Sequence, residues 1–141
     1  MFFLLKVFYG EHWAVEAMIY KPDEPLNSSE WLSLDEAERI SLVKAHHNRI
    51  KTELPNATLH AAIHVTIENQ LAEGIPEVQD AMVRLVKDGI DRHEVIHAIG
   101  SVLAKHIFNI AKGQTQGIDS NRKYLEDLST LTVESWKKEA R

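Results

Sequence analysis

The stretch Thr58-Leu-His-Ala-Ala-Ile-His-Val-Thr-Ile-Glu-Asn-Gln-Leu-Ala72 carries both the folding pattern and the chemistry of this chain. Its apolar side chains recur at i, i+4 spacing, so they share one face of a helix. These side chains are Leu59, Ile63, Ile67 and Leu71. Pro55 precedes the stretch and Gly74 follows it, and both residues interrupt helices. We therefore expect a helix over about residues 57–72.

Similar patterns continue on both sides of this segment. Ser33-Leu-Asp-Glu36 has the form of a capping box, with Ser33 as the N-cap of the next helix. Pro76 suits the first turn of a helix that stops at Gly89, and Asp91 is a good N-cap for the helix after it. The expected helices cover about residues 34–51, 57–72, 76–89, 92–112 and 124–139.

The predicted fold is a single all-α domain, a bundle of about five or six helices. No window alternates with period two, and 141 residues suit one domain. Within it we expect an N-terminal helix and connector (1–30), a helical core with the histidine pairs (31–112), and a polar loop with a C-terminal helix (113–141). Short connections predict that the helices over 57–72 and 92–112 lie roughly parallel and side by side.

Charge and composition exclude several kinds of partner and site. The net charge is −5, and the 16 basic side chains are scattered among 21 acidic ones. Binding to nucleic acid or to an anionic membrane needs a clustered positive field, so neither partner is expected. Cysteine is absent, which removes disulfides, thiolate nucleophiles and Cys-type zinc sites. Any metal would be bound by imidazoles, carboxylates and water.

The apolar N-terminus, residues 1–9, lacks the basic region and cleavage site of a signal peptide and is too short to span a bilayer. We expect an amphipathic helix that packs on the core or on a second subunit, as in a homodimer. The alternative is an upstream extension with Met18 as the natural start. The expected location is the cytoplasm.

Two histidine pairs stand out among the eight histidines. His60 and His64 are four residues apart, so they project from the same helix face one turn apart. The second pair belongs to His93-Glu94-Val-Ile-His97, a His-Glu-x-x-His sequence in which zinc hydrolases use the Glu to polarise metal-bound water. A metalloprotease is disfavoured, because His106 would point away from the pair.

The two pairs together predict a transition-metal site. Small residues flank both pairs, which lets two helices approach closely enough for four imidazoles to share one ion. The predicted ligands are His60, His64, His93 and His97, with His47 and Glu68 as further candidates. Glu94 would act as the base of a metal-dependent hydrolase. Zinc is the expected ion, and carboxylate ligands would make iron or manganese suitable.

Two alternatives stay open at this point. Four tightly closed histidine ligands would indicate a structural ion in an adaptor domain that acts through its surface. A metal-free bundle could instead bury the histidines in a hydrogen-bonded network with Glu68 and Glu94.

The two histidine segments also resemble an uncharacterised bacterial family, catalogued only as a domain of unknown function (DUF eighteen forty-one). Its pattern is a His-x-x-x-His helix followed by Gln-Leu/Ile-Ala, then a His-Glu-x-x-His helix. The matching residues are His60, His64, Gln70, His93, Glu94 and His97. The likeness spans about residues 31–112 and modestly supports His47. It implies a shared helical fold and a shared site, but no reaction.

Overall fold

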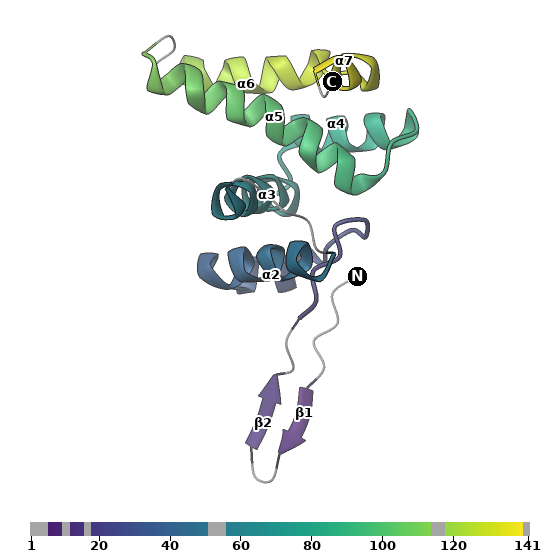
Figure 1. Ribbon diagram of the computed structural model, residues 1–141, viewed down its shortest axis with the longest axis vertical. Coiled ribbons are helices and arrows are strands. Elements are labelled where there is room, and N and C mark those ends of the chain that lie inside the picture. Colours follow the sequence, from purple (N-terminus) through teal and green to yellow (C-terminus); the bar gives the residue numbers. More distant parts are fainter. Residues whose placement is uncertain (1–5, 10–11, 16–17, 51–55, 114–117, 140–141) are drawn as a thin grey trace.

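The computed structural model describes residues 6–9, 12–15, 18–50, 56–113 and 118–139 (Figure 1). Seven helices make up most of this part of the chain. They are α1 (Ser28–Ser33), α2 (Glu36–Arg49), α3 (Ala57–Ala72), α4 (Pro76–Lys87), α5 (Arg92–Ala111), α6 (Ile118–Thr130) and α7 (Val133–Glu139). The predicted all-α class is confirmed, although the helices outnumber the five or six expected. Among the described residues, no helix combines the length and apolarity that crossing a bilayer requires.

The central helices begin and end close to their predicted limits, because local signals fix both ends. The side-chain oxygens of Asn56 and Asp91 accept hydrogen bonds from the first-turn amides of α3 and α5, at 3.0 and 2.8 Å. After α3, α4 and α5 the chain turns at Gly74, Gly89 and Gly113, whose φ angles are 76°, 109° and 74°. Glycine adopts such positive φ angles without steric cost. For α2 the cap is Asp35, which accepts from the Glu38 amide at 2.8 Å, and not the predicted Ser33.

Two corrections to the predicted helices have local causes. The connector over residues 21–33 contains α1, because Asn27 caps it and Trp31 is fully buried. The predicted last helix is divided into α6 and α7. Thr132 and Ser135 exchange hydrogen bonds, each hydroxyl accepting from the other's amide at 3.0 Å, and this starts a new helix. Helix α6 also begins at Ile118, inside the predicted polar loop.

The predicted N-terminal helix is wrong for the described residues there. Strands β1 (Lys6–Tyr9) and β2 (His12–Val15) form an antiparallel hairpin, with Lys6 opposite Val15 and Tyr9 opposite His12. Both segments are rich in aromatic and β-branched residues, which favour extended backbone. Figure 1 shows the hairpin at the opposite end of the molecule from α6 and α7. Residues 1–5 lie outside the described part, and the homodimer stays a prediction.

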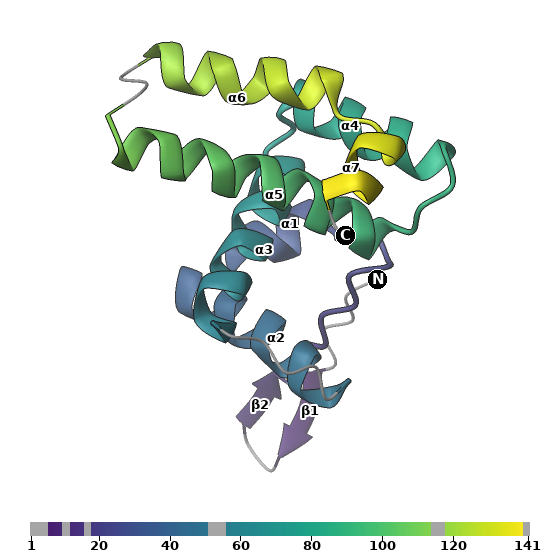
Figure 2. The same ribbon diagram turned by 45° about the horizontal axis from the view of Figure 1, so that its top comes forward.

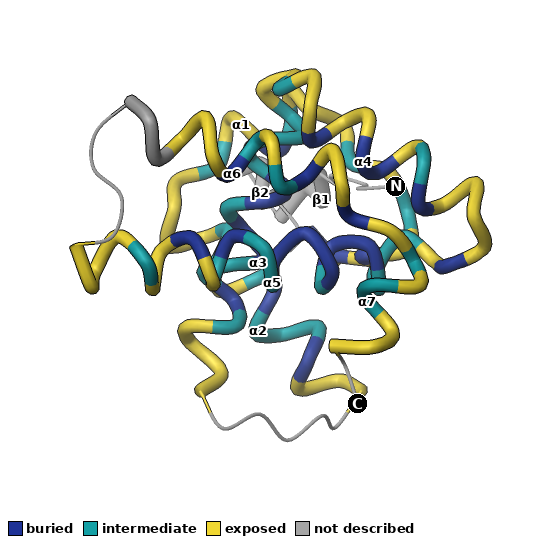
Figure 3. Tube along the Cα trace, turned by 90° about the horizontal axis from the view of Figure 1, so that it is seen from above, coloured by how far each residue is buried: buried dark blue, intermediate teal, exposed yellow. Residues whose placement is uncertain are grey.

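Helices α3 and α5 form the centre of the molecule. Helix α3 packs against α2 on one side and α5 on the other, and α4 and α6 cover the far side of α5 (Figure 2). The two helices are neighbours as expected, but Figures 1 and 2 show that they cross steeply and are not parallel. Their buried residues lie in the middle of the fold, with exposed turns around them (Figure 3). Two apolar clusters result, one centred on α5 and the other around Tyr20, Trp31 and Val43.

The crossing depends on Gly100 of α5. A Cβ atom at this position would lie 2.8 Å from Cγ2 of Ile63 on α3, far inside van der Waals contact. Ile63 is β-branched, so its Cγ2 is held close to the backbone and moves little. The close contact brings the histidines of α3 and α5 together.

We therefore predict that Gly100→Ala lowers the free energy of unfolding by about 1–3 kcal/mol, as overpacking does in well-packed cores. In an Ile63→Ala background the clash is gone. There Gly100→Ala should raise the free energy of unfolding by up to about 1 kcal/mol, the helix-propensity gain of alanine over glycine. Urea unfolding of the four proteins measures both effects. Equal effects of Gly100→Ala in the two backgrounds would contradict a tight crossing.

Candidate metal centre

Histidines from three helices converge between the two apolar clusters. Helix α2 contributes His47, α3 contributes His60 and His64, and α5 contributes His97. One ring nitrogen of each lies within 4.8 Å of a ring nitrogen of every other, and we call this group the histidine centre. Two of these side chains are buried and two are half-buried.

Two of the distances between the ring nitrogens are close to those of a metal site. Nε2 of His64 lies 3.1 Å from Nε2 of His97, and Nε2 of His60 lies 3.1 Å from Nε2 of His47. A tetrahedral ion with Zn–N bonds of about 2.0–2.1 Å would hold its nitrogens about 3.3–3.4 Å apart. All four ligand atoms lie within 4.8 Å of one another, so the group could hold one ion.

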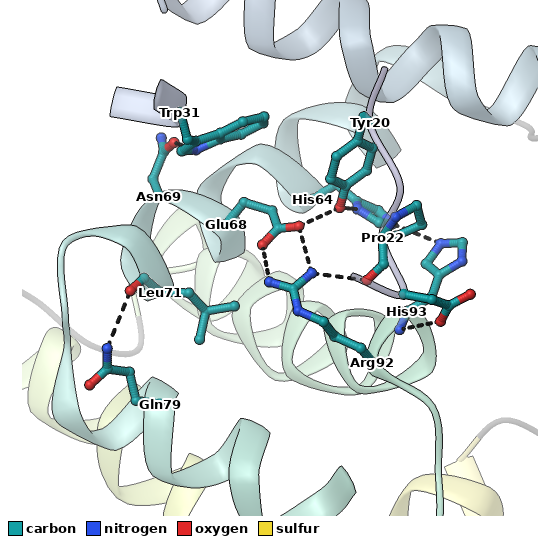
Figure 4. A network of polar contacts seen from close by, with 11 residues as sticks. Tyr20, Pro22, Trp31, His64, Glu68, Asn69, Leu71, Gln79, Arg92 and His93 are labelled. Atoms are coloured by element: carbon teal, nitrogen blue, oxygen red, sulfur yellow. Dashed lines mark hydrogen bonds and ion pairs between the residues drawn. The ribbon is translucent and has the colours of Figure 1, made fainter. Parts of the chain in front are cut away.

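A buried relay fixes the orientation of the His64 ring (Figure 4). The Tyr20 hydroxyl donates to Oε2 of Glu68 at 2.6 Å, and its oxygen lies 3.0 Å from Nδ1 of His64. Because the only hydroxyl hydrogen goes to Glu68, Nδ1 of His64 must be the donor to Tyr20. Nε2 of His64 is then unprotonated, and its lone pair points toward the other histidines.

The backbone fixes His47 in the same way. Its Nδ1 lies 2.8 Å from the carbonyl oxygen of Val43, one turn earlier on α2. A carbonyl oxygen only accepts, so Nδ1 carries the hydrogen and Nε2 is left as a free ligand atom. Such second hydrogen bonds from Nδ1 are typical of metal-binding histidines, because they hold the ring and its tautomer in place.

Lowered pKa values keep the rings of His60, His64 and His97 neutral at physiological pH. Burial lowers the pKa of His60 and of His97 to about 4, and repulsion from neighbouring imidazoles adds to this effect. Burial followed by the same repulsion lowers the pKa of His64 still further. Only a neutral imidazole can bind a metal ion, so the centre is prepared for one before the ion arrives.

His93, a predicted ligand, lies beside the centre and outside its group of four. Its Nε2 is 3.2 Å from Nε2 of His64, and burial lowers its pKa to about 4. Its ring centroid is 5.5 Å from that of His46, a histidine that was not among the predicted site residues. The backbone amide of His93 donates to Asp23 at 3.2 Å, which ties α5 to the chain before α1.

The two predicted carboxylates have other partners. Glu68 is fully buried and accepts from both terminal nitrogens of Arg92, at 2.7 and 3.0 Å, as well as from Tyr20 (Figure 4). It supports His64 through Tyr20 and is no direct ligand in this arrangement. Arg92 also donates to the carbonyl oxygen of Pro22 at 2.9 Å, and it is half-buried. Oε1 of Glu94 accepts from the indole of Trp136 on α7, at 3.3 Å.

A pocket of about 300 Å³ opens beside the histidine centre. Three of the four histidines, His60, His64 and His97, line it, whereas His47 does not. The other lining residues are Ile63, Ile96, Gly100, Ser101, Ala104 and Trp136. An ion in the centre would therefore be reached by small molecules from one side.

No family model, curated protein or solved structure matches this chain. The family resemblance of the histidine segments thus stays a prediction. Function has to be inferred from the histidine centre and its surroundings.

The Glu68–Arg92 ion pair leads to a prediction about stability. Arg92→Met leaves a fully buried carboxylate without its counter-charge, which costs about 3–5 kcal/mol in comparable buried pairs. The double variant Glu68→Gln, Arg92→Met removes both charges and should recover a large part of that loss. Urea unfolding checks both proteins. A loss below about 1 kcal/mol for Arg92→Met would contradict the role of the pair.

The lowered histidine pKa values predict how the metal-free protein responds to acid. Unfolded histidines titrate near 6.5, whereas His60 and His97 titrate at about 4 in the folded protein. Between these values the unfolded state binds more protons, so stability falls as the pH is lowered from about 6.5 toward 4. The melting temperature of the metal-free protein should drop across this window. The double variant His60→Gln, His97→Gln should show a shallower drop, and an equal slope in the two proteins would refute this origin.

Proposed function

We propose that this protein is a small metal-dependent hydrolase whose histidine centre binds one divalent transition-metal ion. One observation carries the proposal. The unprotonated Nε2 atoms of His64 and His47 each lie 3.1 Å from a further ring nitrogen, in His97 and in His60. Hydrogen bonds can join these four nitrogens only two by two. A cation among them would accept a lone pair from each of the four at once.

Zinc is the ion that the ligands favour. The four ligands are neutral imidazoles, which suit zinc, copper, iron and nickel. Manganese prefers carboxylates, and the carboxylate of Glu68 already pairs with Arg92 and Tyr20. Zinc also suits hydrolysis, because it has no redox chemistry of its own.

The pocket favours a catalytic over a structural ion. Structural zinc sites are closed by four protein ligands, whereas catalytic sites leave one position for water or substrate. With four histidine ligands, catalysis needs a fifth position, and zinc can expand to five-coordination. Three of the four histidines line a pocket from which such a fifth ligand could approach. A divalent ion held there would supply a Lewis acid and would lower the pKa of a bound water toward 7.

Glu94 is the proposed base, and its location supports a role near the pocket. It lies one turn before His97 on α5 and binds the indole of Trp136, a pocket residue. Its carboxylate is half-buried. A structural ion in an adaptor domain, or a metal-free histidine network, remains the competing interpretation that the next experiments separate.

Metal binding is tested first, by titrating zinc into chelator-treated, untagged protein against a chromophoric competitor. We expect one ion per chain, with affinity lowered at least ~100-fold in His64→Gln and in His97→Gln, since each loses a ligand. His106→Gln is the matched control. His106 is also buried on α5, but it packs against Tyr124 and is not part of the centre. Wild-type affinity in both ligand variants would rule out this centre.

Hydrolysis is tested with the zinc-loaded protein and 4-nitrophenyl acetate, compared with the His64→Gln variant at the same zinc concentration. Hydrolysis that is faster in the wild-type protein than in the variant, with a rate that rises with pH, supports the proposed hydrolase activity. Stoichiometric zinc without any acceleration would instead identify a structural ion.

A further inference from the structure

The pocket beside the histidine centre has a composition that selects its ligands. Apart from the three histidines, its walls are apolar or small, and none of the described residues that line it is Asp, Glu, Lys or Arg. Burying a charged group of the ligand against these apolar walls, away from the metal ion, would be costly. Its volume of about 300 Å³ is at the lower end for ligand pockets, which excludes polymers and long peptides.

One wall of the pocket is aromatic and held in place. Trp136 comes from α7, whose start is fixed by the paired hydrogen bonds between Thr132 and Ser135. The indole nitrogen donates to Glu94 at 3.3 Å, which ties the ring to α5. A tryptophan ring with its one donor already engaged offers an aromatic surface to whatever enters the pocket.

Small residues of α5 form part of the pocket wall. Gly100 and Ala104 lie on the same face of α5 as His97, and all three line the pocket. A larger side chain at position 104 would take up part of the pocket volume. The size of the pocket therefore depends on the small side chain of Ala104.

The charge of the proposed metal ion determines which group of the ligand can bind next to the histidines. Four neutral ligands leave a divalent ion with its full charge, so an oxygen donor, especially an anionic one, is favoured there. The ligand should thus combine one oxygen donor with a flat apolar body.

We propose that this pocket binds small aromatic compounds that carry a single metal-binding oxygen group, and that aromatic acyl compounds of this size are the substrate class. The ring packs between Trp136 and the apolar wall of Ile63 and Ile96, and the oxygen group reaches the ion. This inference rests on the proposed metal centre.

The test compares two inhibitors on the cobalt-substituted protein. Benzohydroxamate and acetohydroxamate bind metals through the same group and differ in a phenyl ring against a methyl group. Visible absorption of the cobalt ion reports binding of both. We expect benzohydroxamate to bind at least ~10-fold more tightly, because its ring removes more apolar surface from water.

Pocket variants show where the selectivity arises. Ala104→Leu should abolish the preference for benzohydroxamate while acetohydroxamate still binds, and Trp136→Leu should reduce the preference several-fold. Ala111→Leu, the same substitution on an exposed turn of α5, is the matched control and should keep the wild-type preference. Each variant is first checked for one cobalt ion per chain.

The outcomes separate the two proposals. If cobalt binds but both hydroxamates bind equally, or if Ala104→Leu keeps the wild-type preference, the aromatic pocket is refuted and the metal centre stands. If cobalt does not bind the wild-type protein, both proposals fail together.

Discussion

The ion pair between Glu68 and Arg92 is the interaction on which the centre of this protein depends. A fully buried carboxylate is costly to desolvate, and it persists here because Arg92 and Tyr20 together satisfy it. Through the Tyr20 hydroxyl the same carboxylate sets which nitrogen of His64 carries its hydrogen. Arg92 also binds the Pro22 carbonyl, so the pair joins α3, α5 and the segment before α1. Folding and the orientation of a metal ligand thus share one network.

The cluster of imidazoles is a feature that the core would not contain for stability alone. Burial and mutual repulsion lower the pKa of His60, His93 and His97 to about 4, so the fold loses stability in mild acid. A bound cation would reverse this balance, because it replaces repulsion among the rings with coordination. Local arrangements that lower stability often occur at functional sites. The position of this cluster beside a pocket agrees with that pattern.

The sequence predicted those parts of the fold that local signals determine. The limits of α3, α4 and α5 follow from side-chain caps on α3 and α5, from Pro76 at the start of α4, and from glycines at positive φ, such as Gly74 and Gly89. Each signal lies within a few residues of the helix end. The break between α6 and α7 also has a local signal, in Thr132 and Ser135, but a continuous apolar pattern concealed it. The hairpin was missed because its apolar run was interpreted with a helical period and not with an extended one.

For the site, spacing predicted the components better than their roles. The i, i+4 pair of His60 and His64 shares a helix face by geometry alone, and the structure brings both rings to His97. Glu68 continues the same row, but its partner Arg92 is 24 residues away, and only the crossing of α3 and α5 brings them together. His93 and His47 illustrate the same limit. His47 belongs to the group of four and His93 does not. This depends on how α2, α3 and α5 pack together, which spacing along one helix cannot predict.

The most direct test of the central claim is anomalous diffraction at the zinc edge from crystals of the zinc-loaded, untagged protein. The account predicts one strong peak surrounded by ring nitrogens of His47, His60, His64 and His97, at about 2.0–2.1 Å. The pocket side of that peak should be open to solvent or a small ligand. An absence of any peak at this position, or zinc bound only to surface carboxylates, would contradict a metal centre in this protein.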